Sequence, residues 1–125
     1  MEVLFLVPKV TEDKLRSEGK TVPEPIKVKA LVDTGASNCA VDKSIPTNLN
    51  LSPVDITTIK TASSKQHSCY RYYLRMVIPL LNNYTYEDVF NALDFDEQGC
   101  LIGRDFLQGG ILVYVGYMNQ FTLSF

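Results

Sequence analysis

The sequence predicts a single all-β domain that spans residues 1–125. Valine, isoleucine, threonine and tyrosine are concentrated in short runs that proline, glycine and asparagine interrupt, which is the pattern of strands and turns. An apolar period of 3.6 residues never persists beyond about three turns, so long amphipathic helices are not expected. The chain is 46% hydrophobic and 21% charged, a balance typical of a globular domain with one core.

Charge and cysteine content narrow the class of protein further. The net charge is −2 and the basic residues are scattered, so neither a nucleic-acid surface nor a face for anionic membranes is indicated. The first apolar run, residues 3–7, ends at Pro8, which makes it too short to span a membrane. Cys39, Cys69 and Cys100 are an odd number of widely spaced cysteines, so no disulfide framework is expected. The cysteine pattern weakly favours a reducing compartment such as the cytoplasm, and it leaves the localisation open.

The N-terminal third of the chain predicts two strands separated by a loop. Residues 3–7 predict the first strand. Residues 12–25 are rich in charge, glycine and proline, and predict a loop or a mobile hairpin tip. Residues 26–32 alternate with a period of two, which predicts a strand with one buried face that runs into a tight turn at residues 33–35.

The middle of the chain predicts a long hairpin. Residues 38–41 can resume a strand, and residues 44–49 favour a turn or a single helical turn. Residues 55–61 and 70–80 are rich in β-forming residues and predict two paired strands. The polar residues between them, 62–68, would form a tip that stands clear of the core.

The C-terminal third predicts strands and one short helix. Residues 86–93 fit either a helix or a strand, and the pattern leaves that choice open. Residues 100–103 predict a short apolar strand, and residues 104–108 a helix of one to two turns that two glycines terminate. Residues 111–115 and 120–125 predict two strands joined by a turn.

The strongest chemical signal is a single aspartate at the end of an apolar strand. Asp33 enters a turn in which Gly35 permits a backbone shape that other residues resist. Peptide hydrolysis by carboxylates alone requires two of them: one activates water, and the other, kept neutral by like-charge repulsion, polarises the carbonyl. The chain contains no second Asp-Thr-Gly or Asp-Ser-Gly. The second carboxylate would therefore come from another copy of the chain in a two-fold homodimer.

Two motifs together resemble the retropepsin-like aspartic protease family. In that family two hydrophobic residues and Asp-Thr-Gly-Ala are matched later by two hydrophobic residues and Gly-Arg-Asp or Gly-Arg-Asn. Residues 31–36 (Leu-Val-Asp-Thr-Gly-Ala) and residues 101–105 (Leu-Ile-Gly-Arg-Asp) follow this pattern. The likeness covers about residues 26–125, and the pair of motifs is far more specific than Asp-Thr-Gly alone. It implies a closed acid-protease β fold with one short helix after Gly103, and hydrolysis by activated water with no metal or organic cofactor.

The resemblance also implies roles for individual residues. Asp33 would be the catalytic carboxylate, the Thr34 hydroxyl would bond across the dimer axis, and the Gly35 carbonyl would bind the substrate backbone. Further substrate contacts would come from the cleft wall and from the tip of a flap that closes over the peptide, namely Ala36, Ser37, Thr61, Ala62, Ser63 and Ser64.

The second motif and the chain termini would support this site. Leu101, Ile102 and Gly103 would cross behind the Asp33 loop, and the helix that begins at Arg104 would brace it. The terminal strands, near residues 3–7 and 122–125, would interdigitate in the dimer sheet.

The chain departs from the retroviral pattern in ways that change these expectations. Ser37 stands where retroviral members usually have an aspartate that pairs with the arginine, which leaves Asp105 or a main-chain carbonyl as the partner of Arg104. The flap lacks the usual tip glycines, and the segment before Asp33 is longer than a minimal enzyme needs. Ala36 supplies no hydroxyl donor to favour the ionised pair, so we predict maximal activity at about pH 5 to 6.

Other functions compete with this prediction. A domain with the same fold and dimer could bind peptide or a partner protein without turnover, and an Asp33→Asn protein that lost cleavage but kept binding would separate the two. Most Asp-x-Gly segments are turns in which the aspartate accepts a hydrogen bond from its own backbone. Taken alone, Arg104 is equally consistent with a surface arginine near a helix start. His67 is expected to face solvent, which disfavours a Ser-His or Cys-His nucleophile. Residues 94–105 loosely follow the spacing of a calcium loop, but Asp105 replaces the bidentate glutamate, so a solvated acidic turn is predicted.

Overall fold

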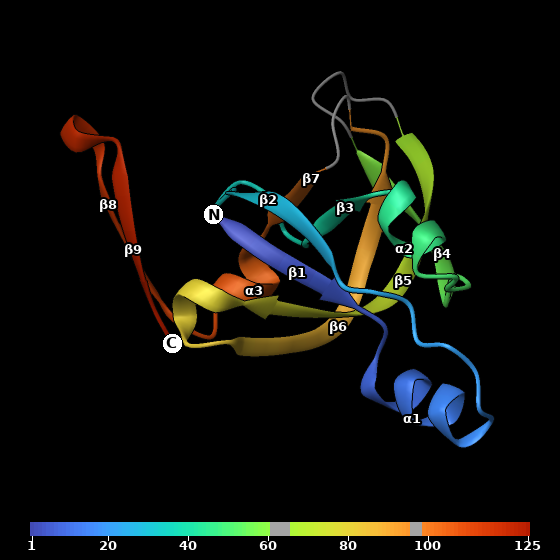
Figure 1. Ribbon diagram of the computed structural model, residues 1–125. Coiled ribbons are helices and arrows are strands. Elements are labelled where there is room, and N and C mark those ends of the chain that lie inside the picture. The colour runs from blue at the N-terminus through green and yellow to red at the C-terminus, as the bar shows by residue number, and fades with distance from the viewer. Residues whose placement is uncertain (61–65, 96–98) are drawn as a thin grey trace.

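The computed structural model describes residues 1–60, 66–95 and 99–125, and it is mostly β (Figure 1). The strands are β1 (Glu2–Leu6), β2 (Ile26–Val32), β3 (Ala40–Asp42), β4 (Asp55–Lys60), β5 (Gln66–Ile78), β6 (Tyr84–Leu93), β7 (Gly99–Ile102), β8 (Ile111–Val115) and β9 (Gln120–Ser124). The helices are α1 (Lys9–Ser17), α2 (Ser44–Asn48) and α3 (Arg104–Leu107), with short 3-10 turns at η1 (Pro79–Leu81) and η2 (Gly116–Met118). Strands account for 49% of the structure and helices for 21%, which confirms the predicted β class.

Six of the strands close into a barrel. Their order is β1-β2-β7-β3-β6-β5, and a further pairing of β1 with β5 closes the circle, while β4 extends the sheet beyond β5. The pairs β2–β7 and β3–β6 are parallel, and the remaining pairs are antiparallel. The parallel pair β2–β7 sets the ends of two strands side by side, and these are the strands that carry the two sequence motifs.

Apolar side chains from alternating strand positions fill the barrel. Val3 and Phe5 point inward from β1, as do Leu74 and Met76 from β5, and all four are fully buried. Phe90 of β6 meets Phe5 edge to face, with the two ring centroids 5.4 Å apart. This period-two burial is what a half-exposed strand produces, and it explains why the sequence pattern identified most of these strands.

The long hairpin expected in the middle of the chain is confirmed. Strands β4 and β5 pair antiparallel from Asp55 opposite Arg71 to Lys60 opposite Gln66. The Arg71 Nε donates to Asp55 Oδ1 over 2.6 Å, which clamps the base of this hairpin. Strand β5 begins earlier than predicted, and residues 61–65 at the tip lie outside the described residues.

Of the remaining predictions for local structure, most are confirmed and the N-terminal loop is partly wrong. The open choice for residues 86–93 is settled as strand β6, and α2, α3, β3, β7 and the β8–β9 pair form where the sequence predicted them. The prediction of a loop over residues 12–25 is wrong for its first half, which belongs to α1. The expectation of one short helix is therefore wrong too, because α1 and α2 accompany α3.

Helix α1 forms although none of its residues is fully buried, and Val10 and Leu15 are its only large apolar residues. Its first turn is held by the Glu87 carboxylate, whose Oε1 accepts the Lys9 N–H over 2.6 Å. Glu12 and Arg16, one turn apart, form an ion pair of 2.9 Å. Local charge pairs and a capping carboxylate from β6 thus stabilise a segment that composition alone assigns to a loop.

Strand β1, which was expected to join a sheet between subunits, pairs within its own chain, and its place in a dimer sheet stays a prediction. It pairs with β2 from Glu2 to Phe5 and with β5 from Leu4 to Leu6, so both of its edges are engaged within its own chain. The β8–β9 hairpin differs, because it forms a separate two-stranded sheet that projects from the barrel (Figure 1). The C-terminal part of the predicted dimer sheet is thus the part that stands clear of the barrel.

We predict that acid weakens the attachment of α1 to the barrel. Hydrogen bonds from Arg16 and from Arg75 of β5 lower the pKa of Glu12 from 4.5 to about 2. Because the folded-state pKa lies below the unfolded one, this carboxylate stabilises the fold fully above pH 4.5 and loses that effect as the pH falls towards 2. The measurement is the urea midpoint between pH 7 and pH 2.5 for the wild type and for Glu12→Gln.

The difference between the two midpoints isolates Glu12 from other carboxylates with lowered pKa values, such as Asp42 and Asp55. It should be largest at neutral pH and shrink below pH 4.5. A difference that stays constant down to pH 2.5 would show that Glu12 carries no such linkage.

Candidate active site

Asp33 lies in a tight loop immediately after β2. Val32 pairs with Ile102 of β7, and the Asp33 N–H donates to the Ile102 carbonyl over 2.9 Å. The Asp33 Oδ1 accepts the Gly35 N–H over 2.9 Å, and the Ala36 N–H donates to the Asp33 carbonyl over 3.2 Å. Among the described residues nothing donates to Asp33 Oδ2, and the side chain is half-exposed. The loop therefore fixes one carboxylate oxygen and leaves the other accessible.

Arg104 joins the second motif to this loop. Its Nη1 donates to the Thr34 carbonyl over 2.9 Å and its Nη2 to the Ser37 Oγ over 3.3 Å. Its backbone N–H donates to the Ala36 carbonyl over 2.9 Å. The acceptors of the Arg104 side chain are thus a main-chain carbonyl and a hydroxyl.

Gly103 makes the close approach of the two motifs possible. A Cβ at this position would lie 2.6 Å from the backbone C and O of Asn38 and 2.9 Å from the Ala36 carbonyl oxygen. These are backbone atoms, which cannot move aside without shifting the loop. The glycine of the second motif is therefore required by the packing of β7 and α3 against the Asp33 loop.

Asp105 makes contacts that sequence reasoning missed. Its carboxylate accepts the Cys39 N–H, with 3.0 Å to Oδ1 and 3.2 Å to Oδ2, a contact that the sequence did not predict. Its own N–H donates to the Ser37 carbonyl over 3.1 Å. No sequence signal links two residues so far apart, because the contact depends on how α3 docks beside β3.

A groove of about 530 Å³ borders the loop between β2 and the β8–β9 hairpin. Its lining residues come from both elements and are Met1, Ala30, Leu31, Val32, Thr34, Leu112, Tyr114, Asn119 and Phe121. Thr34 and Leu31 are both exposed and flank Asp33 in sequence. The groove therefore reaches the Asp33 loop at Thr34.

The predicted flap residues Thr61, Ala62, Ser63 and Ser64 lie outside the described residues. His67 is exposed as expected, although it belongs to β5 and not to a loop.

Burial raises the pKa of the thiols of Cys39, Cys69 and Cys100 above the ordinary value, which keeps them protonated and unreactive.

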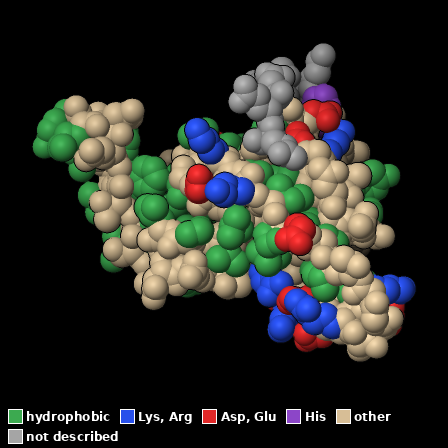
Figure 2. All heavy atoms as spheres, in the orientation of Figure 1, with side chains coloured by type: hydrophobic (Ala, Val, Ile, Leu, Met, Phe, Trp, Pro, Cys, Tyr) green, Lys and Arg blue, Asp and Glu red, His purple; other side chains and the backbone are tan. Residues whose placement is uncertain are grey.

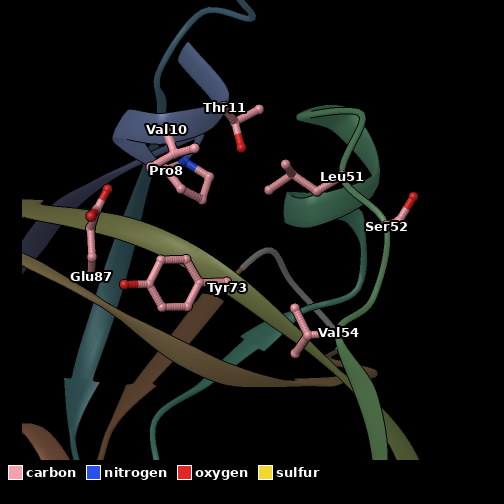
Figure 3. Close-up of a pocket in the computed structure, with 8 residues that line it drawn as sticks. All are labelled: Pro8, Val10, Thr11, Leu51, Ser52, Val54, Tyr73 and Glu87. Carbon is pink, nitrogen blue, oxygen red and sulfur yellow. The ribbon is translucent and has the colours of Figure 1, made fainter. Parts of the chain in front are cut away.

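A second groove, of about 350 Å³, lies between α1, the segment after α2 and the strands β5 and β6 (Figure 3). Val10, Leu51, Val54 and Tyr73 are among the residues that line it, and Glu87 at its rim is the residue that caps α1. It contains none of the predicted site residues.

Among the described residues, no helix is long and apolar enough to cross a membrane. The same residues contain no cluster of three or more His, Cys, Asp or Glu side chains that could hold a metal ion.

Comparison of the chain with models of known protein families, with curated proteins and with solved structures found no match. Inference about function therefore depends on the loop geometry and on the two motifs.

Proposed function

We propose that this chain is one half of a homodimeric, retropepsin-like aspartic endopeptidase. The observation that carries the proposal is the hydrogen-bonded junction of the two motifs, in which Ile102 of β7 holds the start of the Asp33 loop and Arg104 holds its middle. An isolated turn aspartate needs no such support from a distant motif. The arrangement suits a carboxylate whose position must be fixed before the substrate arrives.

The chemistry follows from pairing Asp33 with its counterpart in a second copy. Two carboxylates that face each other across a two-fold axis share one proton, because both cannot remain ionised at close range. The ionised member takes a proton from water, which attacks the peptide carbonyl, while the protonated member polarises the carbonyl oxygen. The leaving amine then accepts a proton from the pair, and no covalent intermediate is formed. An extended peptide would lie between this loop and the β4–β5 hairpin.

The β8–β9 hairpin supports the dimeric part of the proposal. Its exposed side chains are largely apolar, and Figure 2 shows hydrophobic groups gathered at its tip. Phe125 anchors only its base, through ring contacts with Phe106 and Tyr84 at centroid distances of 4.5 and 5.3 Å. A two-stranded sheet with an exposed apolar surface is stabilised by association, and the groove beside it leads to Thr34.

A charge placed on this hairpin is expected to weaken the dimer. Tyr114 is 65% exposed and faces the groove, so Tyr114→Lys would introduce an unpaired charge into the proposed interface. We expect the dimer dissociation constant to rise about tenfold or more, as for loss of a central aromatic contact. Sedimentation equilibrium measures this. The control is Val10→Lys on α1, at a side chain 80% exposed and remote from the loop, which should leave the constant unchanged. Equal dimer dissociation constants for the two variants would show that the hairpin is not part of the interface.

The proposed activity is tested by cleavage of a mixed peptide library near pH 5.5, about the middle of the expected range, at several protein concentrations. The wild type is compared with Asp33→Asn, which keeps the shape of the side chain and loses its charge. Cleavage that rises more steeply than protein concentration and vanishes in the variant is the expected result, since only the dimer holds a complete site. A confirmed dimer that cleaves nothing would instead favour a domain that binds peptide without turnover.

A further inference from the structure

The carboxylate of Asp105 meets the chain where the Asp33 loop ends and β3 is about to begin. It accepts the N–H of Cys39 at 3.0 and 3.2 Å and the N–H of Phe106 at 2.8 Å. The Cys39 thiol donates to Asp105 Oδ1 over 3.1 Å, and its sulfur accepts the Gly103 N–H over 3.3 Å. Cys39 is fully buried, and Asp105 is half-buried. One carboxylate therefore satisfies both the amide and the thiol of a residue that water does not reach.

This cluster completes a support that runs along the whole loop. The loop starts at Asp33, whose N–H is held by the Ile102 carbonyl, and ends at Cys39, whose N–H is held by Asp105. Between these points Ala36 and Ser37 accept the backbone N–H groups of the first two residues of α3. Without the Asp105 carboxylate the buried Cys39 N–H would have no acceptor, and the end of the loop would have to move to find one.

We propose that Asp105 is a positioning residue that sets the orientation of Asp33 through Cys39. This inference rests on the proposed function, and it assigns to Asp105 a role separate from that of Arg104. Arg104 holds the carbonyl side of the loop, at Thr34 and Ala36. The Asp105 carboxylate holds the Cys39 N–H at the loop's end, so these two neighbouring residues bind carbonyl groups and an amide group of the same segment.

Two substitutions at Asp105 separate positioning from bulk stability. Asp105→Ala removes both oxygens. Asp105→Asn keeps an amide oxygen in the place of Oδ1, which already accepts from Cys39 and Phe106, and should restore most of the function. Glu12→Ala is the control, because Glu12 lies in α1, binds Arg16 and Arg75, and has no contact with the Asp33 loop among these bonds.

The experiment measures kcat and KM for each folded, dimeric variant, with the dimer fraction taken from sedimentation. Asp105→Ala should lower kcat about ten- to hundredfold, as expected for a displaced catalytic group, and leave KM within about twofold of the wild type. Asp105→Asn should recover kcat to within about threefold, and Glu12→Ala should change neither constant. A wild-type kcat in Asp105→Ala, or equal losses in Asp105→Ala and Glu12→Ala, would overturn the proposal.

Amide hydrogen exchange distinguishes this failure from failure of the proposed function. If the wild type cleaves no peptide, the proposed function fails, but exchange still reports whether Asp105 holds the loop. The amides of Gly35, Ala36 and Cys39 should exchange at least about tenfold faster in Asp105→Ala, and those of β1 should not change. Unchanged exchange in the loop would overturn the positioning role, whether or not the chain cleaves peptide.

Discussion

Replacing Gly103 with alanine is expected to destabilise the protein by about 2 to 3 kcal/mol, at the upper end of the usual range for overpacking. The added methyl group would lie 2.6 Å from the Asn38 backbone, so β7 and the Asp33 loop would have to separate. The separation would also lengthen the hydrogen bonds from Arg104 to the loop. The peptide cleavage rate should therefore fall further than the loss of folded protein alone would explain. Urea unfolding gives the first quantity and peptide cleavage the second.

Gly109→Ala is the matched control for this substitution. A Cβ there would lie 3.5 Å from the nearest atom, the Phe106 carbonyl oxygen, which is an ordinary contact distance. Its effect on the free energy of unfolding should stay within about 0.5 kcal/mol. If both glycines tolerate alanine equally, then the close packing of the two motifs is not what holds the loop.

Phe90→Ala is expected to cost about 3 to 5 kcal/mol, because it removes a large buried ring and leaves a cavity. Phe90 has no exposed surface and packs edge to face against Phe5 and Tyr86, with centroid distances of 5.4 and 6.0 Å. These three residues join β1 to β6 across the barrel interior. A loss of this size is a large fraction of the stability of a typical domain, so the urea midpoint of the variant should fall markedly.

Tyr70→Ala provides the comparison at an exposed aromatic residue. Tyr70 lies on β5 and is 54% exposed, so its removal should cost less than about 1 kcal/mol. The free energies of unfolding of both variants come from urea titration at one temperature. Comparable losses at the two sites would show that the barrel interior is not the main source of stability.

The sequence could predict elements whose pattern is local. Strand β2 was predicted because its apolar and lysine residues alternate, and α3 because two glycines follow it. Helix α1 could not be predicted in this way, since it buries none of its residues and depends on Glu87 from β6 for its first turn. The pairing of β1 with both β2 and β5 was likewise invisible, because edge use is decided by closure of the barrel.

The candidate site shows the same division. The motif at Asp33 and its match at Gly103 and Arg104 could be recognised from residue order alone. The acceptors of Arg104 could not, because the sequence offered several candidates and only tertiary structure distinguishes them. The contact between Asp105 and Cys39 spans 66 residues and has no sequence signature.

The central claim, that two chains share one catalytic site, is tested most directly by mixing subunits. Wild-type protein is mixed with Asp33→Asn at constant total concentration, allowed to exchange, and assayed for peptide cleavage. If each site needs Asp33 from both copies, activity falls as the square of the wild-type fraction, to about one quarter in an equal mixture. Activity that falls only in proportion to the wild-type fraction, to about one half in the same mixture, would show that each chain acts alone and would contradict the account.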